Sequence, residues 1–354
     1  MPFRIETGLL NPDTAQYAGK GQARATIAAI ANEARRIEAL GFDGACAPEA
    51  GHDPFLPLVV AAEHTSRIRL GTNVAIAFPR SPMVTAQMAW DLQQLSGGRF
   101  TLGLGTQVKG HNELRYSTPW TAAPGPRLRE YVLCLQAIFQ SFQDGKPSAF
   151  EGRHYRFSLL PPFFNPGPID HPPPPIYLAA VNPYMSRLGG ELCAGIRLHA
   201  IDTFQYTREI VLPAIAAGAA KRGRRLADVD VVGAPFLAIG ADEGEVRKAL
   251  QALKQHVSFY ASTRTYHTVL AFHGWEDVGL ELHRLSREGK WQDMPALITD
   301  DMLAEWAIIA TYDRLAAEIR ARCDGIFSTV LLDLPHRLRQ DEGRVRELVQ
   351  TLHG

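Results

Sequence analysis

Two loops of this sequence have the residue types of a phosphate-binding site. Each belongs to an apolar, β-rich run: Gly105, Thr106 and Gln107 follow residues 100–104, and Ala180, Val181 and Asn182 end the run that begins at 176. Backbone N–H groups of a glycine loop and the N-terminus of a helix both attract anions. Asn182 followed by Pro183 is typical of a helix start, here for a helix over 185–192. We predict that both loops bind a cofactor phosphate; a plain turn is the alternative.

The loop at Gly105 belongs to a strand, helix, strand pattern over residues 67–113. An apolar run (68–78) precedes a helix opened by Ser81 and Pro82, and a Gly97-Gly98 stop precedes the run at 100–104. A parallel strand pair needs such a crossover, so the pattern predicts a parallel sheet covered by helices. Ligands bind at the carboxyl ends of the strands in these sheets. Asn73, Val74, Phe78 and the loop over 106–113 should therefore lie at the site.

The same alternation continues along the chain. Strands are predicted over 3–10, 42–48, 68–78, 100–104, 176–181, 195–201, 228–240 and 326–334, and helices follow them, including 203–222, 308–323 and 341–352. Eight strand and helix units predict an α/β fold of the (β/α)8 TIM barrel type, as one domain over 1–354 with insertions at about 145–175 and 256–303. A doubly wound open sheet is the alternative.

Composition limits the function classes. The 37 basic residues balance 37 acidic ones, which speaks against nucleic acid or an anionic membrane as a partner. No apolar run approaches membrane length, and no basic leader precedes an apolar core, so a cytoplasmic location is expected. The four cysteines lack metal-ligand spacing. We therefore expect buried thiols and no metal site.

Several motifs together resemble the luciferase-like monooxygenase superfamily. They are FDG at 42–44, DPF at 53–55, AAEHTSRIRLGT at 61–72, LSGGRF at 95–100 with GLG at 103–105, YLAA at 177–180 and IIAT at 308–311. GTQVK at 105–109 and FYAST at 259–263 further resemble the subgroup that uses coenzyme F420. The resemblance implies a TIM barrel with FMN or F420 in its mouth, a non-proline cis peptide near Asn73-Val74, and a homodimer or homotetramer.

The resemblance also points to catalytic candidates. Many members place a histidine directly after the acidic residue that matches Glu49, but this chain has Ala50 there, so His52 is the nearest replacement. His52 could donate a proton or only bond to Asp53 or backbone. Glu49 could be a base or an acceptor that fixes its loop, and we favour the acceptor. Glu113 is a catalytic candidate by position, and the neighbouring Asn112 is expected at the cofactor.

The pocket for the substrate is predicted to be largely apolar. Phe78, Trp120 and Tyr177 could form its walls, although each could equally be a core residue. His199, at the end of a strand, could position a ring or belong to the core. These four residues form the predicted substrate pocket, and the sequence does not identify the substrate.

The resemblance predicts a coenzyme F420-dependent oxidoreductase that moves hydride between the deazaflavin and a small organic substrate. One alternative is a two-component monooxygenase that takes reduced FMN from a partner reductase. A second is a barrel that binds cofactor without catalysis, an idea supported by the missing histidine at Ala50.

Overall fold

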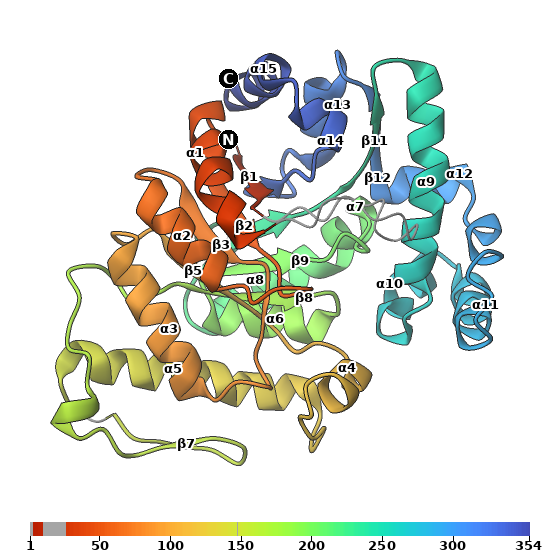
Figure 1. The fold of residues 1–354 in the computed structure, drawn as a ribbon. Helices are drawn as coiled ribbons and strands as arrows, with labels where there is room; N and C mark the ends of the chain where they lie inside the picture. The colour runs from red at the N-terminus through yellow and green to blue at the C-terminus, as the bar shows by residue number, and fades with distance from the viewer. Residues whose placement is uncertain (1–2, 10–25, 147) are drawn as a thin grey trace.

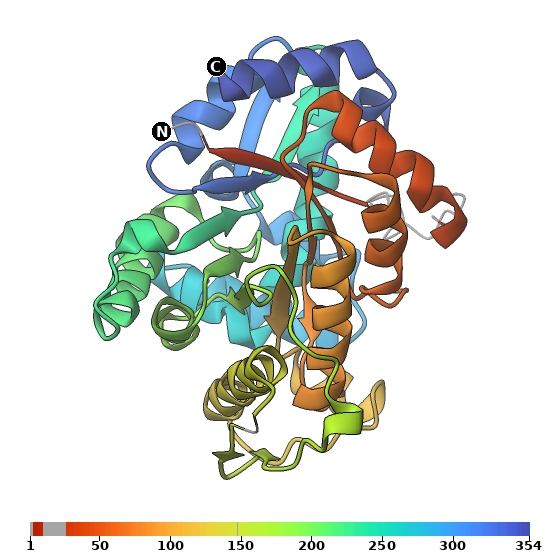
Figure 2. The ribbon, with the colours of Figure 1, turned by 90° about the vertical axis from the view of Figure 1, so that its left-hand side faces the viewer.

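The computed structural model describes residues 3–9, 26–146 and 148–354, and it contains a closed barrel of eight parallel strands (Figures 1 and 2). The strands are β1 (Arg4–Gly8), β2 (Gly44–Ala47), β3 (Arg69–Thr72), β5 (Phe100–Gly105), β8 (Ile176–Ala180), β9 (Gly195–Leu198), β10 (Asp230–Gly233) and β13 (Thr329–Leu331). Every neighbouring pair is parallel, and the pairings of β3 with β5 and of β13 with β1 close the ring. The predicted TIM barrel is confirmed, and the open sheet is wrong.

Helices cover the outside of the barrel. They are α1 (Ile30–Leu40), α2 (Leu56–His64), α3 (Pro82–Leu95), α5 (Pro124–Asp144), α6 (Pro183–Leu192), α8 (Leu212–Ala220), α13 (Leu315–Cys323), α14 (His336–Arg339) and α15 (Glu342–His353). Their starts follow the expected chemistry, since the Ser81 hydroxyl accepts a hydrogen bond from Val84 N before α3. Gly41 ends α1 at a φ of 93°, a conformation that glycine adopts without cost.

The inside of the barrel contains buried charges near the amino-terminal ends of the strands. Glu6 and Arg197 are each about 3% exposed and form an ion pair of 2.9 Å. Arg69 lies 3.3 Å from Glu6 and 3.5 Å from Asp230, and the Tyr177 hydroxyl donates to Asp230 at 2.9 Å. The charges compensate one another, which is what burial of ions requires.

The two insertions lie on different sides of the barrel (Figure 1). The first contains a short hairpin of β6 (Phe150–Glu151) and β7 (Arg156–Phe157). The second lies between β11 (Phe236–Gly240) and β12 (Ala307–Thr311), which pair as a separate parallel sheet. Between them come α9 (Glu243–Ala261), α10 (His267–Phe272), α11 (Glu276–Arg287) and α12 (Asp300–Trp306). This unit has its own apolar cluster, which includes Leu253, Leu282 and Trp306.

Three predicted elements are wrong in detail. Residues 307–311 form β12 and not the start of a helix, because the run Ile308-Ile309-Ala310 is apolar on both faces and fits a buried strand equally well. The predicted strand over 228–240 breaks between β10 and β11 at Pro235, which lacks a backbone N–H. The predicted helix over 203–222 is α7 (Phe204–Tyr206), a π-helical turn (Thr207–Val211) and α8.

The structure also bears on two expectations from the sequence, those about membrane-spanning helices and about the cysteines. Within the described ranges, no helix combines the length and the apolarity needed to cross a bilayer. All four cysteines are buried and none forms a disulfide, so the predicted buried thiols are confirmed.

Candidate active site at the mouth of the barrel

The carboxyl ends of β3, β5, β8 and β9 are neighbours in the ring and form one side of the barrel mouth. Between β3 and β4 (Ala75–Ile76), the peptide bond from Asn73 to Val74 is cis, as predicted. Ile76 pairs with Gly105, which brings the turn at Asn73 beside the end of β5. Three of the loops predicted to bind the cofactor therefore meet at this mouth, those that follow β3, β5 and β8.

Gly105 makes room for the side chain of Val74. A Cβ atom at Gly105 would lie 2.7 Å from Val74 Cγ2 and 3.5 Å from the Cβ of Ala179. The first distance is shorter than any ordinary contact, so only glycine fits here without a shift of its neighbours. Gly105 is buried, and its lack of a side chain lets Val74 pack closely against the backbone at the end of β5.

The loop after Gly105 is fixed by a buried amide. Asn112 is fully buried, and its Nδ2 donates to the carbonyl oxygens of Thr106 at 2.9 Å and Val108 at 3.1 Å. Its Oδ1 has no hydrogen-bond partner among the described residues. An unpaired buried acceptor costs free energy, which a polar ligand or water would recover. Gln107 has a φ of 53°, so the loop turns sharply at the mouth. The segment predicted as a loop continues as the short helix α4 (Lys109–Leu114).

The second predicted phosphate loop leads into α6. Asn182 caps this helix, because its side chain accepts from Met185 N at 3.0 Å, and Pro183 follows at the first helical position. Since β5 and β8 are paired, Ala180 and Val181 lie beside the Thr106 loop. The side chain of Asn182 thus accepts a hydrogen bond from one of the N–H groups at the start of α6. The positive end of the helix dipole still faces the mouth.

Glu49 fixes its loop through hydrogen bonds. Its Oε2 accepts from Ile76 N at 2.7 Å and from Arg80 Nη1 at 2.7 Å, and the side chain is only 5% exposed. Arg80 also binds Asp53 at 3.0 Å. Burial alone would lower the pKa of Arg80, but the two carboxylates outweigh it and raise this pKa. The geometry favours the acceptor role for Glu49, which joins the loops after β2 and β4.

We expect Arg80→Met to lower the free energy of unfolding by about 2 kcal/mol. The change leaves the Glu49 carboxylate buried without its counter-charge. The loss should be smaller than the ~3–5 kcal/mol typical of a fully buried pair, because Arg80 is partly exposed. Urea denaturation measures it. Arg156→Met, which breaks an exposed pair with Glu151, is the control and should change stability by less than about 0.5 kcal/mol. Equal losses of stability in the two variants would contradict the prediction, because Arg80 would then stabilise the fold no more than an exposed arginine does.

The other two catalytic candidates lie near the surface. His52 is exposed in the loop between β2 and α2. The Glu113 side chain is 39% exposed on α4 and lies 4.0 Å from Lys109. Arg115, just after α4, donates to the carbonyl oxygen of Ala50, so the two loops are in contact. The structure thus brings His52 and Glu113 to neighbouring loops but not into a buried constellation with Glu49.

The predicted pocket residues separate into three places. Phe78 and Trp120 are in contact edge to face at 5.8 Å, and the Arg127 guanidinium lies 4.2 Å from the Phe78 ring centroid. His199 directly follows β9, which is the next strand round the ring after β5 and β8. Tyr177 is buried near the amino-terminal ends of the strands with Asp230, so the structure does not bring it to the mouth.

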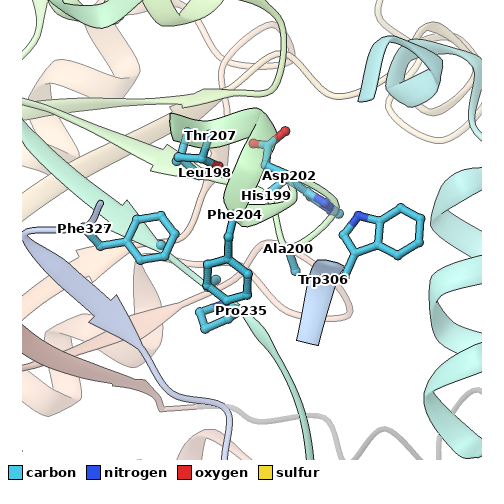
Figure 3. A pocket seen from close by; sticks show the side chains of 11 residues that line it. Leu198, His199, Ala200, Asp202, Phe204, Thr207, Pro235, Trp306 and Phe327 are labelled. Atoms are coloured by element: carbon cyan, nitrogen blue, oxygen red, sulfur yellow. The ribbon is translucent and has the colours of Figure 1, made fainter. Parts of the chain in front are cut away.

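A pocket at the end of β9 is lined in part by His199, Asp202 and Trp306 (Figure 3). The Trp306 indole donates to the carbonyl oxygen of Ile201 at 2.6 Å, which fixes this loop against the second insertion. Burial, with His256 nearby, lowers the pKa of His199 to about 4. Burial raises the pKa of Asp202 well above its ordinary value, and neither carboxyl oxygen has a partner within the described residues.

The depressed pKa of His199 predicts a loss of stability in mild acid. The unfolded chain takes up the proton near pH 6.5 and the folded chain only near pH 4, so this contribution is present above pH 6.5 and lost as the pH falls toward 4. The difference in unfolding free energy between the natural chain and His199→Gln should change by about 1.4 kcal/mol per pH unit in that window. Urea denaturation at a series of pH values measures it. The exposed-site control His111→Gln should give a curve parallel to that of the natural chain; a parallel curve for His199→Gln would contradict the prediction.

Sequence reasoning missed Arg80, Asp202 and the rings around His199. The one sequence feature that marks Arg80 is its position between a predicted strand and the helix cap at Ser81. No group of three or more His, Cys, Asp or Glu side chains with metal-ligand geometry occurs in the part of the chain that the structure describes.

Comparison with known proteins agrees with this arrangement. The family model described as luciferase-like monooxygenase matches residues 7–329. An uncharacterised protein of Mycobacterium tuberculosis is 44% identical over 309 residues, 87% of this chain and 89% of the relative. An F420-dependent glucose-6-phosphate dehydrogenase of Intrasporangium calvum is 27% identical over 317 residues, 85% and 86% of the two chains.

Solved structures share the fold. The coenzyme F420-dependent tetrahydromethanopterin reductase of Methanopyrus kandleri superposes with a TM-score of 0.76 at 22% identity, over 99% of both chains. The EDTA monooxygenase of Chelativorans sp. superposes with a TM-score of 0.70 at 16% identity, over 99% of this chain and 94% of that one.

Proposed function

The chain belongs to the luciferase-like monooxygenase family, and from this membership we propose that it is a coenzyme F420-dependent oxidoreductase acting on a small organic substrate. A relative 27% identical over most of both chains is an F420-dependent dehydrogenase, which supports this cofactor. The deazaflavin, when bound, supplies a carbon centre that gives or takes hydride. The protein supplies binding, orientation and exclusion of water.

The observation that carries the proposal is the loop after β5, which the hydrogen bonds of Asn112 hold in place. Asn112 is buried, and its Nδ2 donates to the carbonyl oxygens of Thr106 and Val108. A loop fixed in this way, beside the start of α6, suits the phosphate side of a deazaflavin or flavin. Gly105 and Val74 would lie against the ring system, and Phe78 with Trp120 would form an apolar wall.

Reduced FMN with oxygen is the second candidate. The EDTA monooxygenase shares the fold, and a phosphate loop of this kind holds either cofactor. This alternative requires a partner reductase, and deazaflavin does not sustain the oxygen chemistry of reduced flavin. The two candidates therefore differ in an observable, which is consumption of oxygen.

The test compares turnover with each cofactor across a panel of alcohols, aldehydes and ketones. The proposal predicts substrate-dependent change in the visible absorbance of F420 under anaerobic conditions, with no need for oxygen. Oxygen uptake that depends on substrate, FMN and a flavin reductase, without activity on F420, would overturn it in favour of the monooxygenase.

A further inference from the structure

The imidazole of His199 lies on the inner side of the barrel, at the carboxyl end of β9. It directly follows β9, two residues after Arg197, which lies inside the barrel beside Glu6. Side chains alternate across a strand, so His199 shares the inward face but lies at the carboxyl end. The residue is partly exposed. Its ring is therefore at the mouth, where a substrate would approach a cofactor.

The tautomer of His199 follows from one hydrogen bond. The backbone N–H of Ile201 donates to Nδ1 at 3.1 Å. An N–H group can only donate, so Nδ1 offers its lone pair and a neutral ring carries its proton on Nε2. No buried, unpaired atom of His199 occurs among the described residues. Nε2 is thus an N–H donor on a ring whose other nitrogen is occupied.

Two aromatic rings hold the imidazole in place. Tyr266 stacks on it at 4.9 Å with an interplanar angle of 26°, and Tyr260 meets it edge on at 4.6 Å. Both tyrosines come from the second insertion, which has its own apolar core. This insertion therefore fixes the direction in which a donor on the barrel points.

We propose that His199 is a substrate-binding residue, a neutral imidazole whose Nε2–H donates a hydrogen bond to a carbonyl oxygen of the substrate. The proposal rests on the proposed function and narrows the substrate to a compound with a carbonyl at the reacting carbon, or to the corresponding alcohol. A reduced deazaflavin, when bound, would supply the hydride and become oxidised, and the carbonyl carbon would gain a C–H bond as its π electron pair moves to oxygen. The Nε2–H of His199 would stabilise this oxygen by a hydrogen bond, and the proton that completes the alcohol would come from bulk solvent.

The surroundings of His199 keep the ring neutral. Its own pKa and that of His256 both fall to about 4, mainly because of burial. Burial raises the pKa of Tyr266 to about 12, and it raises that of Asp202 well above its ordinary value. Tyr260 is a further titratable group that faces the ring. At neutral pH the imidazole of His199 is therefore uncharged and keeps its Nε2–H as a hydrogen-bond donor. It is not an imidazolium that could give a proton to the substrate.

The first test uses the full chain labelled with 15N-histidine, without cofactor. Long-range nitrogen–proton correlation identifies the tautomer of each ring, and His199→Gln assigns the signal. We expect the Nε2–H tautomer with no titration between pH 5.5 and 8, a window that lies entirely above the depressed pKa of about 4. A proton on Nδ1, or a titration near pH 6.5, would overturn the proposal.

The second test measures binding of a carbonyl probe, cyclohexanone, against methylenecyclohexane, which has the same shape without the oxygen. The ketone should shift the His199 Nε2–H resonance saturably, and the hydrocarbon should not. His199→Phe, which keeps a ring, should weaken ketone binding about 3- to 10-fold, the usual size of one lost hydrogen bond. His199→Gln, which retains an N–H donor, should lose less.

No shift with the ketone, or equal losses for the two variants, would overturn the substrate-binding role. Neither measurement uses F420, so a negative result here is distinguishable from a failure of F420 to bind. The proposed function can therefore stand while the His199 assignment falls.

Discussion

Gly105→Val is expected to weaken F420 binding by roughly 5- to 100-fold. The new Cβ would lie 2.7 Å from Val74 Cγ2, so the end of β5 and the turn at Asn73 must move apart. Such overpacking costs about 1–3 kcal/mol, and the upper value corresponds to roughly 100-fold in a dissociation constant. The displaced Val74 side chain would then disturb the turn at Asn73, where the cofactor ring is expected to lie. Fluorescence titration with F420 measures the loss.

Two further variants separate packing from binding. Gly110→Val is the matched control, because a Cβ at Gly110 meets nothing within 4 Å; it should leave affinity unchanged. The double variant Gly105→Ala with Val74→Ala removes the clash while retaining a side chain at Gly105. If Gly105 only accommodates Val74, the double variant binds as well as Val74→Ala alone. We expect it to bind more weakly, and equal affinities would contradict the assignment of Gly105 to the cofactor site.

Glu6→Leu is expected to lower the free energy of unfolding by about 3–5 kcal/mol, the range for a buried charge left without its partner. Arg197 is 3% exposed and binds Glu6 at 2.9 Å inside the barrel. Among the described residues, Glu6 is the carboxylate with which Arg197 pairs, and Arg69 at 3.3 Å from Glu6 would lose a partner too. Urea denaturation followed by circular dichroism measures the change.

The double variant Glu6→Leu with Arg197→Met provides the control. Replacing both members of a buried pair by apolar side chains is often nearly neutral, so the double variant should be more stable than the sum of the single losses predicts. Strictly additive losses would show that the two side chains act independently. In that case the ion pair would not be what stabilises the interior.

The sequence predicted the barrel because its strongest signals are local. All eight barrel strands fall within or overlap predicted runs, and the caps at Ser81 and Asn182 lie where the residue types indicated. The errors lie where periodicity is ambiguous. Residues 307–311 are apolar on both faces, so their assignment to β12 required the partner strand β11, about 70 residues earlier.

The site was less predictable because its roles depend on distant partners. A glutamate after a strand looks the same as a base or as an acceptor, and its partners Ile76 and Arg80, 27 and 31 positions away, favour the second role for Glu49. Tyr177 is on a barrel strand as predicted, but it is the second residue of β8 and so lies in the wrong layer for the mouth. The tautomer of His199 depends on a backbone N–H that no sequence pattern reveals.

The most direct test of the cofactor assignment is titration of the purified chain with F420 and, separately, with FMN, following the fluorescence of each. We expect saturable binding of F420 that is at least tenfold tighter than that of FMN, a difference of about 1.4 kcal/mol. Gly105→Val should weaken the binding of both cofactors, and Gly110→Val should leave both affinities unchanged. Tighter binding of FMN, or binding of neither cofactor, would contradict it.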